Sequence, residues 1–499
     1  MSHAYVAFDL GAESGRAMLA VLRGQTLELQ EVHRFANVPQ LLPSGYHWSL
    51  TEIWRNLVEG LRKCGELARQ QNVELVSLGV DTWGVDFGLI GRSGQLLGLP
   101  FVYRDPRHLP AYEKALTAVG RETIYDATGI QFMPINSLYQ LVAQHDSEPA
   151  LVEHAAALLF MPDLLHYFFS GRAVNEATIA STSQMVDVHT GKWAVNLIKA
   201  LGLPHHFLGS IVPAGTVIGD LREAVAREAN VPMMRVTAPA SHDTASAVAA
   251  VPVDTQHTPN WAYISSGTWS LMGAEIDAPI VSEAARQANF TNERGVADRI
   301  RLLRNIAGLW LVQECRRDFA RRGQSFDYAE LTRLAQEAEP FRTIVDPGHA
   351  PFATPGDMPA KIAAFARETG QPEPTTPGQF VRCCLESLAM RYRQTLEDLE
   401  EVLGRRMEVV HIVGGGGQNT LLNQMASDAM ARPVIVGPYE ATAIGNALTQ
   451  AMGIDDVRDL AHLREIVRNS FKPVTYQPRD PDAFTKQYER YINLTRARG

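Results

Sequence analysis

Short apolar runs typical of β-strands alternate along this chain with longer segments whose apolar positions have helical spacing. Two of the runs, far apart, end in the same kind of turn: residues 6–16, VAFDLGAESGR, and residues 262–270, AYISSGTWS. In each, Gly with Ser, Thr or Asp interrupts the run before a second apolar run follows. We expect two β-hairpins whose turn amides and hydroxyls can bind phosphate oxygens. One copy in each half predicts two lobes closing on one nucleotide.

The rest of the first half alternates strand-like and helix-like patterns. Residues 49–52, SLTE, have the spacing of a capping box and predict an amphipathic helix running to about Gln71. Buried or partly buried strands are expected at 76–80, 87–90, 157–160 and 236–238. This mixture of hairpins and strand–helix units favours an α/β lobe with a mixed sheet.

The second half restarts at the hairpin of residues 262–270. Its further elements are expected to be helices near 308–322 and 378–403, a strand at 409–413 and a following helix. The Pro- and Gly-rich segments 346–359 and 372–377 predict loops. We place the boundary at the segment of residues 241–250, with an N-terminal lobe of residues 1–244 and a C-terminal lobe of residues 245–499.

Composition narrows the class of protein. A chain of 499 residues exceeds what one hydrophobic core usually supports, so two domains are expected. The net charge of −9 argues against non-specific nucleic-acid binding. No apolar segment is long enough for a membrane helix, and no leader pattern precedes the first strand. The four cysteines are too few and too badly spaced for a disulfide framework or a CxxC metal site. We expect a cytoplasmic protein.

Asp9 ends a strand and enters the turn of residues 11–15. A carboxylate there can hold hydrated Mg²⁺ against a phosphate, or it can accept from its own backbone in an Asx-turn. The residues alone leave both interpretations open. Neither turn is a Walker loop, because the only Gly-Lys pair, Gly191-Lys192, precedes Trp193.

Residues 411–419, HIVGGGGQN, lead from an apolar strand into a helix opened by Asn419 or Thr420. Four glycines allow a ligand to approach the backbone, and the helix N-terminus favours negative or polar ligand groups. Asn419 stands where a GxGxxG motif has its last glycine, which argues against a dinucleotide site. A purely structural glycine turn is the alternative.

Residues 241–248, SHDTASAV, begin a helix of small residues directly after a strand. By itself this pattern favours capping by Ser241 or Asp243. The functional alternative makes Asp243 a general base for a hydroxyl that attacks a phosphoryl group. The helix dipole would then favour its ionised form. His242 could orient a sugar hydroxyl or could be a partly buried histidine with satisfied hydrogen bonds.

Two further segments, 81–86 (DTWGVD) and 103–107 (YRDPR), combine acceptors, aromatic rings and a glycine or arginines, which suits a polyol. The alternative for the second is a surface Arg–Asp pair beside a turn. In residues 304–313, Asn305 is a candidate helix cap and Trp310 a candidate core residue.

In this order, the segments resemble the FGGY carbohydrate kinases. The resemblance rests on residues 9–16 (DLGAESGR), 81–87 (DTWGVDF), 103–107 (YRDPR), 241–248 (SHDTASAV), 265–273 (SSGTWSLMG), 305–311 (NIAGLWL) and 411–424 (HIVGGGGQNTLLNQ). It implies the two-lobed actin-like ATPase (ribonuclease H-like) fold with a central cleft. It also implies transfer of the γ-phosphoryl group of ATP, with Mg²⁺, to the 1-hydroxyl of L-rhamnulose.

The resemblance also implies roles for single residues. Asp243 would be the proton acceptor, and Asp9 would lie near Mg²⁺. Sugar contacts would come from Gly84, His242, Asp243, Thr244 and Asn305. ATP contacts would come from Ala12, Glu13, Ser14, Gly15, Arg16, Thr268, Gln313 and Gly415. Glu13 departs from the family pattern, where Ser is usual, and places an anion near ATP unless it points outward.

Three rival functions follow from the same sequence. One is a kinase of this family for another ketose, such as L-fuculose or L-xylulose. The second is a non-catalytic actin-like ATP-binding switch, which has no need of a base at Asp243. The third, a dehydrogenase, is disfavoured by the missing dinucleotide fingerprint. The expected partners are small molecules, without nucleic acid or membrane, and the oligomeric state stays open with a monomer as one option.

Overall fold

The computed structural model describes residues 2–496 and divides the chain into two compact units. Unit 1 comprises Met1–Asp254, Glu275–Leu302 and Ala441–Phe471, and unit 2 comprises Thr255–Ala274, Leu303–Glu440 and Lys472–Gly499. Each unit is therefore assembled from three separate stretches, whereas the sequence pattern predicts a division at a single point.

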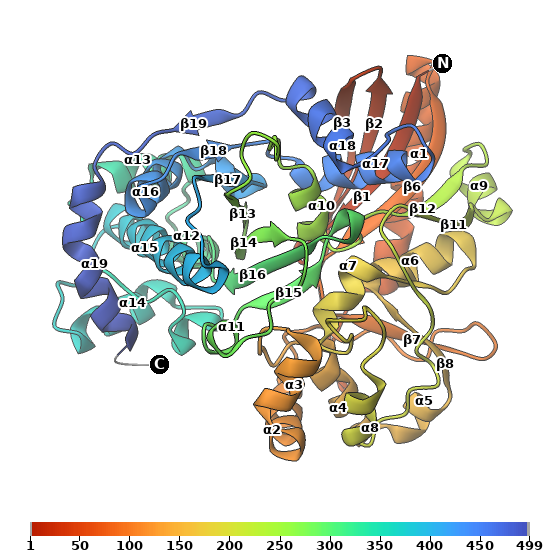
Figure 1. The fold of residues 1–499 in the computed structure, drawn as a ribbon, viewed down its shortest axis with the longest axis horizontal. Helices are drawn as coiled ribbons and strands as arrows, with labels where there is room; N and C mark the ends of the chain where they lie inside the picture. The colour runs from red at the N-terminus through yellow and green to blue at the C-terminus, as the bar shows by residue number, and fades with distance from the viewer. Residues whose placement is uncertain (1, 497–499) are drawn as a thin grey trace. The chain divides into compact units, whose positions relative to one another are not determined.

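Unit 1 is built on a six-stranded mixed sheet in the order β11-β12-β6-β1-β2-β3 (Figure 1). Its strands are β1 (His3–Leu10), β2 (Ser14–Arg23), β3 (Thr26–Ala36), β6 (Glu74–Thr82), β11 (Thr216–Asp220) and β12 (Arg235–Ala238). β1, β2 and β3 form an antiparallel meander, while β6 runs parallel to both β1 and β12. The first predicted hairpin and the mixed sheet are both confirmed.

The two faces of this sheet carry different chemistry. Phe8 stacks on Phe169 of α6 (Met161–Ser170), with ring centroids 5.6 Å apart, on the face that α1 (Leu50–Gln71) also covers. The opposite face carries Asp9 and is packed by α17 (Ala441–Gly453), whose Gln450 donates to Val6 O at 3.1 Å. Strand alternation therefore separates an apolar core from a polar layer.

Helix α1 begins and ends where the sequence pattern predicts, but not for the predicted reason. Ser49 does not cap the helix, because its Oγ donates to Val38 O at 3.1 Å. The helix is instead specified by its apolar face, on which Ile53, Leu57 and Leu61 are buried.

The remaining elements of unit 1 surround the sheet or form small two-stranded pairs, except β15, which is hydrogen-bonded to β16 as the edge strand of a seven-stranded sheet. The strands are β4 (Gln40–Leu42), β5 (Gly45–His47), β7 (Phe87–Gly91), β8 (Ala155–Phe160), β9 (Asn175–Glu176), β10 (Ile211–Val212) and β15 (Thr291–Arg294). The helices are α2 (His108–Val119), α3 (Arg121–Thr128), α4 (Ser137–Ser147), α5 (Pro149–Glu153), α7 (Ala177–Ala180), α8 (Val195–Ala200), α9 (Glu223–Ala229), α10 (Asp243–Ala249), α11 (Glu283–Gln287) and α18 (Leu460–Ser470).

Unit 2 is built on strands hydrogen-bonded in the order β16-β14-β13-β17-β18-β19. These are β13 (Trp261–Ser266), β14 (Ser270–Ile276), β16 (Ile300–Ile306, which enters from unit 1), β17 (Val409–Val413), β18 (Val434–Val436) and β19 (Val474–Tyr476). Its helices are α12 (Trp310–Arg321), α13 (Tyr328–Glu337), α14 (Met358–Glu368), α15 (Pro377–Leu403), α16 (Thr420–Met430) and α19 (Pro481–Arg496). The second hairpin, β17 and the two long helices of this half are confirmed.

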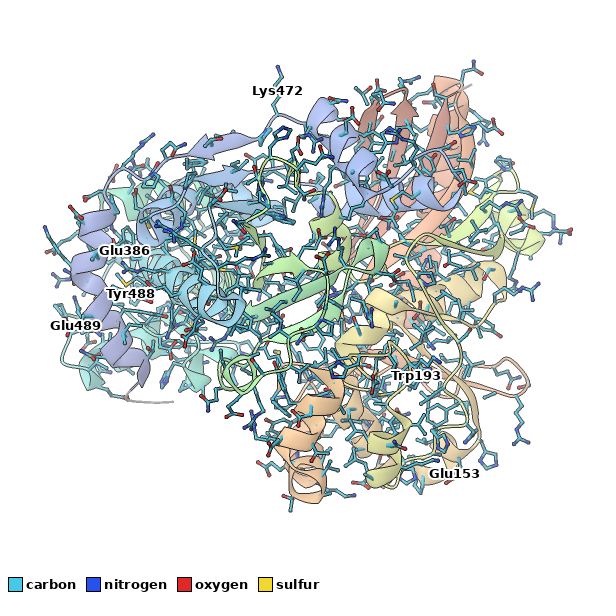
Figure 2. All side chains as sticks on the ribbon, in the orientation of Figure 1. Glu153, Trp193, Glu386, Lys472, Tyr488 and Glu489 are labelled. Carbon is cyan, nitrogen blue, oxygen red and sulfur yellow. The ribbon has the colours of Figure 1, made fainter. Side chains whose placement is uncertain are left out.

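The loop prediction for residues 346–359 is wrong in part. A 3-10 turn covers Ala350–Ala353, and α14 already begins at Met358, whose successor proline suits the first turn of a helix. Glu386 on α15, labelled in Figure 2, is a buried carboxylate of the same unit. It accepts from Phe341 N and Arg382 Nε at 2.8 Å each.

A buried histidine behind the central sheet makes stability depend on pH. His166 on α6 accepts from Val80 N at 2.9 Å, and burial lowers its pKa to about 3. The unfolded chain binds a proton near pH 6.5, so the contribution of neutral His166 is present above that pH and is lost as the pH falls toward 3. At about pH 4.5 the loss amounts to about 3 kcal/mol.

We therefore expect His166→Gln, whose amide oxygen can accept the same bond without titrating, to flatten this dependence. Between pH 7 and about 4.5, the thermal unfolding midpoint should fall less in the variant than in the wild type. Other titrating groups are common to both proteins, so equal falls would contradict the assignment.

Candidate active site

Asp243 is the first residue of α10 in unit 1. His242, in extended conformation, occupies the N-cap position without a capping side-chain bond. Capping by Ser241 is therefore wrong, whereas Asp243 does accept from a free amide of the first turn. Ser241 Oγ donates instead to Pro239 O, and Asp243 Oδ1 accepts from Thr244 N at 2.5 Å and Thr244 Oγ1 at 3.1 Å. Thr244 thus holds one oxygen of the carboxylate.

The segment that leads into α10 is held by a carboxylate that sequence reasoning missed. Glu176 is fully buried and accepts from Ser241 N at 3.0 Å, while Thr178 Oγ1 accepts from His242 N at 3.1 Å. Burial raises the pKa of Glu176. Its only local signal is the N-cap of the short helix α7, where it accepts from Thr178 N and Ile179 N.

Three aspartates determine the electrostatics of the site. Asp9 on β1 and Asp81 on β6 are register partners in adjacent parallel strands. The pKa of Asp81 lies well above its usual value, because of burial and then the negative charge of Asp9. Desolvation also raises the pKa of Asp243, and Asp9 adds to the effect. Burial therefore opposes the effect expected of the helix dipole, which favours the ionised form of Asp243.

Asp243 nevertheless stays accessible, because its side chain keeps 33% of its surface exposed. A carboxylate with a raised pKa that a ligand can reach is a better proton acceptor than an ordinary surface aspartate.

The turn of residues 11–15 in unit 1, which is expected to bind phosphate, is closed by backbone hydrogen bonds. Asn37, directly after β3, bonds it as well. Gly11 N donates to Ser14 O at 2.8 Å, and Asn37 donates to Gly11 O and to Glu13 O at 3.1 and 3.0 Å. Glu13 itself is exposed, as is Val38 next to Asn37. Asn37 was not singled out from the sequence.

Asp9 lies inside β1 and pairs across the hairpin with Arg16, whose Nη2 donates to Asp9 Oδ2. Because the side chain bonds Arg16, the Asx-turn interpretation does not hold. Arg16, an expected ATP contact, here neutralises the carboxylate that was expected to lie near the metal.

The aspartates of the DTWGVD segment are hydrogen-bonded inside unit 1. Asp86 is buried and accepts from Trp48 Nε1, Gln140 Nε2 and Trp83 Nε1 at 2.6, 2.8 and 3.0 Å. Burial still raises its pKa to about 6. These bonds fix the backbone two residues after Gly84, which is itself half-buried.

The polyol interpretation fails for Asp81 and Asp105. Asp81 is fully buried, and its Oδ2 accepts from Asn446 Nδ2 at 2.6 Å. Asp105 is buried as well, and it accepts from Tyr46 N at 2.7 Å and Arg107 N at 3.0 Å, so it is no surface pair either.

In unit 2, the second hairpin turn is pinned by the start of α12. Leu309 N donates to Gly267 O at 3.0 Å and Trp310 N to Thr268 O at 3.2 Å. Leu309 occupies the N-cap, and Asn305 lies inside β16, so Asn305 is not a cap. Trp310 is buried, as expected for core.

The glycine run follows β17 as a 3-10 turn, Gly415–Gln418, and Asn419 then caps α16 by accepting from Leu422 N at 2.9 Å. A Cβ on Gly414 would lie 2.9 Å from Ser266 O, and one on Gly416 would clash with Ser266 Oγ. A Cβ on Gly415 would meet nothing within 4 Å. Packing against β13 thus explains its neighbours, while Gly415 faces open space.

The structure therefore groups the predicted site residues by unit. Unit 1 holds Asp9, Ala12, Glu13, Ser14, Gly15, Arg16, Gly84, His242, Asp243 and Thr244, and unit 2 holds Thr268, Asn305, Gln313 and Gly415. Gln313 Oε1 is buried without a hydrogen-bond partner.

Within residues 2–496, no group of three or more His, Cys, Asp or Glu side chains is arranged to hold a metal ion. Mg²⁺ takes only one or two carboxylates when phosphates supply further oxygens. Asp9, beside the unpartnered Oδ1 of buried Asp81, fits that requirement. Over the same residues, no helix is long and apolar enough to span a membrane.

Comparison with known proteins places the chain among sugar kinases. Residues 4–249 match the N-terminal domain of the FGGY family of carbohydrate kinases, and residues 262–454 match its C-terminal domain. The chain is 42% identical over 496 residues to a rhamnulokinase of Bacteroides thetaiotaomicron, covering 99% of this chain and 100% of that one. It is 39% identical over 476 residues to a rhamnulokinase of Oceanobacillus iheyensis, covering 95% and 98%.

Solved structures show the fold. A ligand-bound xylulose kinase from Lactobacillus acidophilus matches with a TM-score of 0.81 at 13% identity, covering 99% of this chain and 98% of that one. A Plasmodium falciparum glycerol kinase with ADP matches with a TM-score of 0.78 at 17% identity, covering 100% and 98%. The expected two-domain actin-like fold is confirmed.

Proposed function

The chain belongs to the FGGY family of carbohydrate kinases, and from that premise we propose that it phosphorylates the 1-hydroxyl of L-rhamnulose with ATP, giving L-rhamnulose 1-phosphate and ADP. The observation that carries the choice of sugar is the identity of 42% to a rhamnulokinase over nearly all of both chains. No observation favours another ketose, a non-catalytic ATP-binding switch or a dehydrogenase.

Asp243 is the residue we assign to proton removal. Phosphoryl transfer through a loose transition state needs in-line positioning and charge stabilisation, and the attacking hydroxyl must lose its proton. Thr244 bonds Oδ1 of Asp243, and His242 also lies nearest Oδ1, at 3.4 Å. We therefore assign Oδ2 to the incoming proton. His242, Thr244, Gly84 and Asn305 are our candidates for the sugar-binding groups.

ATP binding is assigned to the two hairpin turns and the glycine run. The turn of residues 12–16 supplies amides, and Thr268 and Gln313 supply polar side chains. Gly415 supports the assignment because its Cβ position is open, unlike those of the adjacent glycines. Asp9 would hold Mg²⁺, which would neutralise phosphate charge when bound.

An ADP-release assay with and without sugar tests the proposal. L-rhamnulose, L-fuculose and L-xylulose are compared at matched concentrations, and we expect the highest kcat/KM with L-rhamnulose. A clear preference for another ketose would overturn the substrate, and ATP turnover that ignores sugar would overturn the kinase activity.

Substitutions at the adjacent glycines Gly415 and Gly416 can distinguish a role in ATP binding from a role in packing. We expect Gly415→Ala to leave the unfolding midpoint near wild type, because the new methyl group would meet no protein atom within 4 Å. KM for ATP should rise several-fold, because the methyl group would occupy space that we assign to ATP. Gly416→Ala should lower the midpoint, since its methyl group would meet Ser266. Thermal unfolding and steady-state kinetics are the measurements. The same effect in both variants would contradict the distinction.

A further inference from the structure

Behind Asp243 lies a buried cluster of charged groups that the mechanism has not used. His242, Glu293 on β15 and Arg301 on β16 all belong to unit 1. Their side chains are 8%, 6% and 0% exposed, so water cannot screen them. Arg301 is held in place by its Nε, which donates to Arg294 O at 3.0 Å.

The contacts at His242 Nδ1 determine where the imidazole proton lies. Arg301 Nη2 lies 3.1 Å from Nδ1 with hydrogen-bond geometry. Arginine can only donate, so Nδ1 must accept. The neutral ring then carries its proton on Nε2, which lies 3.4 Å from Asp243 Oδ1. His242 therefore presents a donor to the carboxylate.

Glu293 offers the competing arrangement. Its Oε2 lies 3.2 Å from His242 Nδ1 and 3.0 Å from Arg301 Nη2, but neither contact has hydrogen-bond geometry. A proton on Nδ1 could be donated to Glu293. The lone pair of Nε2 would then face the carboxylate of Asp243, and the two would repel each other. Burial alone would raise the pKa of Glu293, but Arg301 and His242 hold it below the usual value. The Glu293–Arg301 pair therefore stays ionised.

We propose that Arg301, neutralised by Glu293, is a positioning residue that fixes the Nε2–H tautomer of His242, so that this donor faces Asp243 Oδ1 at 3.4 Å. Thr244 bonds the same oxygen, which leaves Oδ2 toward the sugar hydroxyl. The catalytic consequence rests on the proposed function of Asp243 as base, whereas the tautomer does not.

The tautomer is read by ¹⁵N NMR of protein labelled at histidine, without substrate. The His242 signals are identified by their loss in His242→Gln, at about pH 8.5, two units above the ordinary histidine pKa. We expect protonated Nε2 in the wild type and in Arg301→Lys, which keeps a cationic donor. In Arg301→Met only Glu293 remains at Nδ1, and the proton should move to Nδ1.

A matched control is Arg464→Met. Arg464 is also a buried arginine of unit 1, and it pairs with Glu275 at 2.9 Å. Its loss leaves an unpaired buried carboxylate too, so the unfolding midpoint should fall as in Arg301→Met. The His242 signals should stay at their wild-type positions.

Kinetics complete the test. Arg301→Met should lower kcat about 10- to 100-fold with KM for ATP near wild type, and Arg301→Lys should recover part of the loss. A proton on Nδ1 in the wild type overturns the proposal, and this measurement needs no variant to fold. An Nε2 proton retained in Arg301→Met also overturns it. If wild-type protein releases no ADP in response to sugar, the proposed function fails while the tautomer result stands.

Discussion

Asp243→Asn is expected to lower kcat by at least about 10²-fold while the affinity for ATP stays near wild type. Asparagine has the same shape, and its amide oxygen can still accept from Thr244 N and Oγ1, as Asp243 Oδ1 does. It cannot take up the proton of an attacking hydroxyl. Steady-state kinetics with saturating L-rhamnulose measure the first effect, and calorimetric titration with ATP measures the second.

The pH dependence provides an independent check of the same assignment. Because burial and Asp9 raise the pKa of Asp243, activity should fall on the acidic side at a higher pH than an exposed aspartate would give. That limb of the kcat/KM profile should disappear from any residual activity of Asp243→Asn. Asp220→Asn, at an exposed carboxylate paired with Arg235, is the matched control and should keep both rate and profile. Sugar-dependent turnover near wild type in Asp243→Asn would remove this residue from its role.

Gly445→Ala is expected to be the most damaging small change to the fold of unit 1. In a helix, alanine is more favourable than glycine by about 1 kcal/mol. At this position, however, a Cβ would clash with the Ser246 carbonyl of α10. We expect a net loss of about 2–3 kcal/mol or more. Because α10 also carries Asp243, its displacement should lower kcat about 10²-fold. Thermal unfolding and turnover are measured on the same preparation.

Gly209→Ala is the control for this substitution. Gly209 has no atom within 4 Å of its Cβ position and no left-handed backbone angle. Its variant should match the wild type in both measurements. If Gly445→Ala matched it too, α17 and α10 would not be packed as closely as the structure has them.

Local sequence patterns predicted the elements that are decided locally. Both hairpins, α1, α15 and β17 depend on runs of apolar residues whose spacing is visible in the chain itself. The capping box at Ser49 failed because Val38, eleven residues earlier, takes its hydroxyl. The spacing of residues 49–52 contains no information about a hydrogen-bond acceptor outside the helix.

The candidate site was predicted only in part, for the same physical reason. Asp243 stands out because of its neighbours. Glu176, which accepts from the backbone of Ser241, and Arg301, which donates to the ring of His242, lie about sixty residues away on either side. The burial that raises the pKa of Asp243 could not be predicted, because burial is a property of the tertiary fold. Likewise, four consecutive glycines could not reveal that only Gly415 is left open by packing.

The assembly of unit 1 from three stretches has a consequence for synthesis. Asn446 and Gln450 supply hydrogen bonds to Asp81 and to the backbone of β1, yet they follow Asp254 by nearly two hundred residues. At roughly 5–20 residues per second, the ribosome needs on the order of ten seconds or more to deliver them. Until then the nascent sheet exposes one uncovered face, so chaperone capture should fall on the amino-terminal half of the polypeptide.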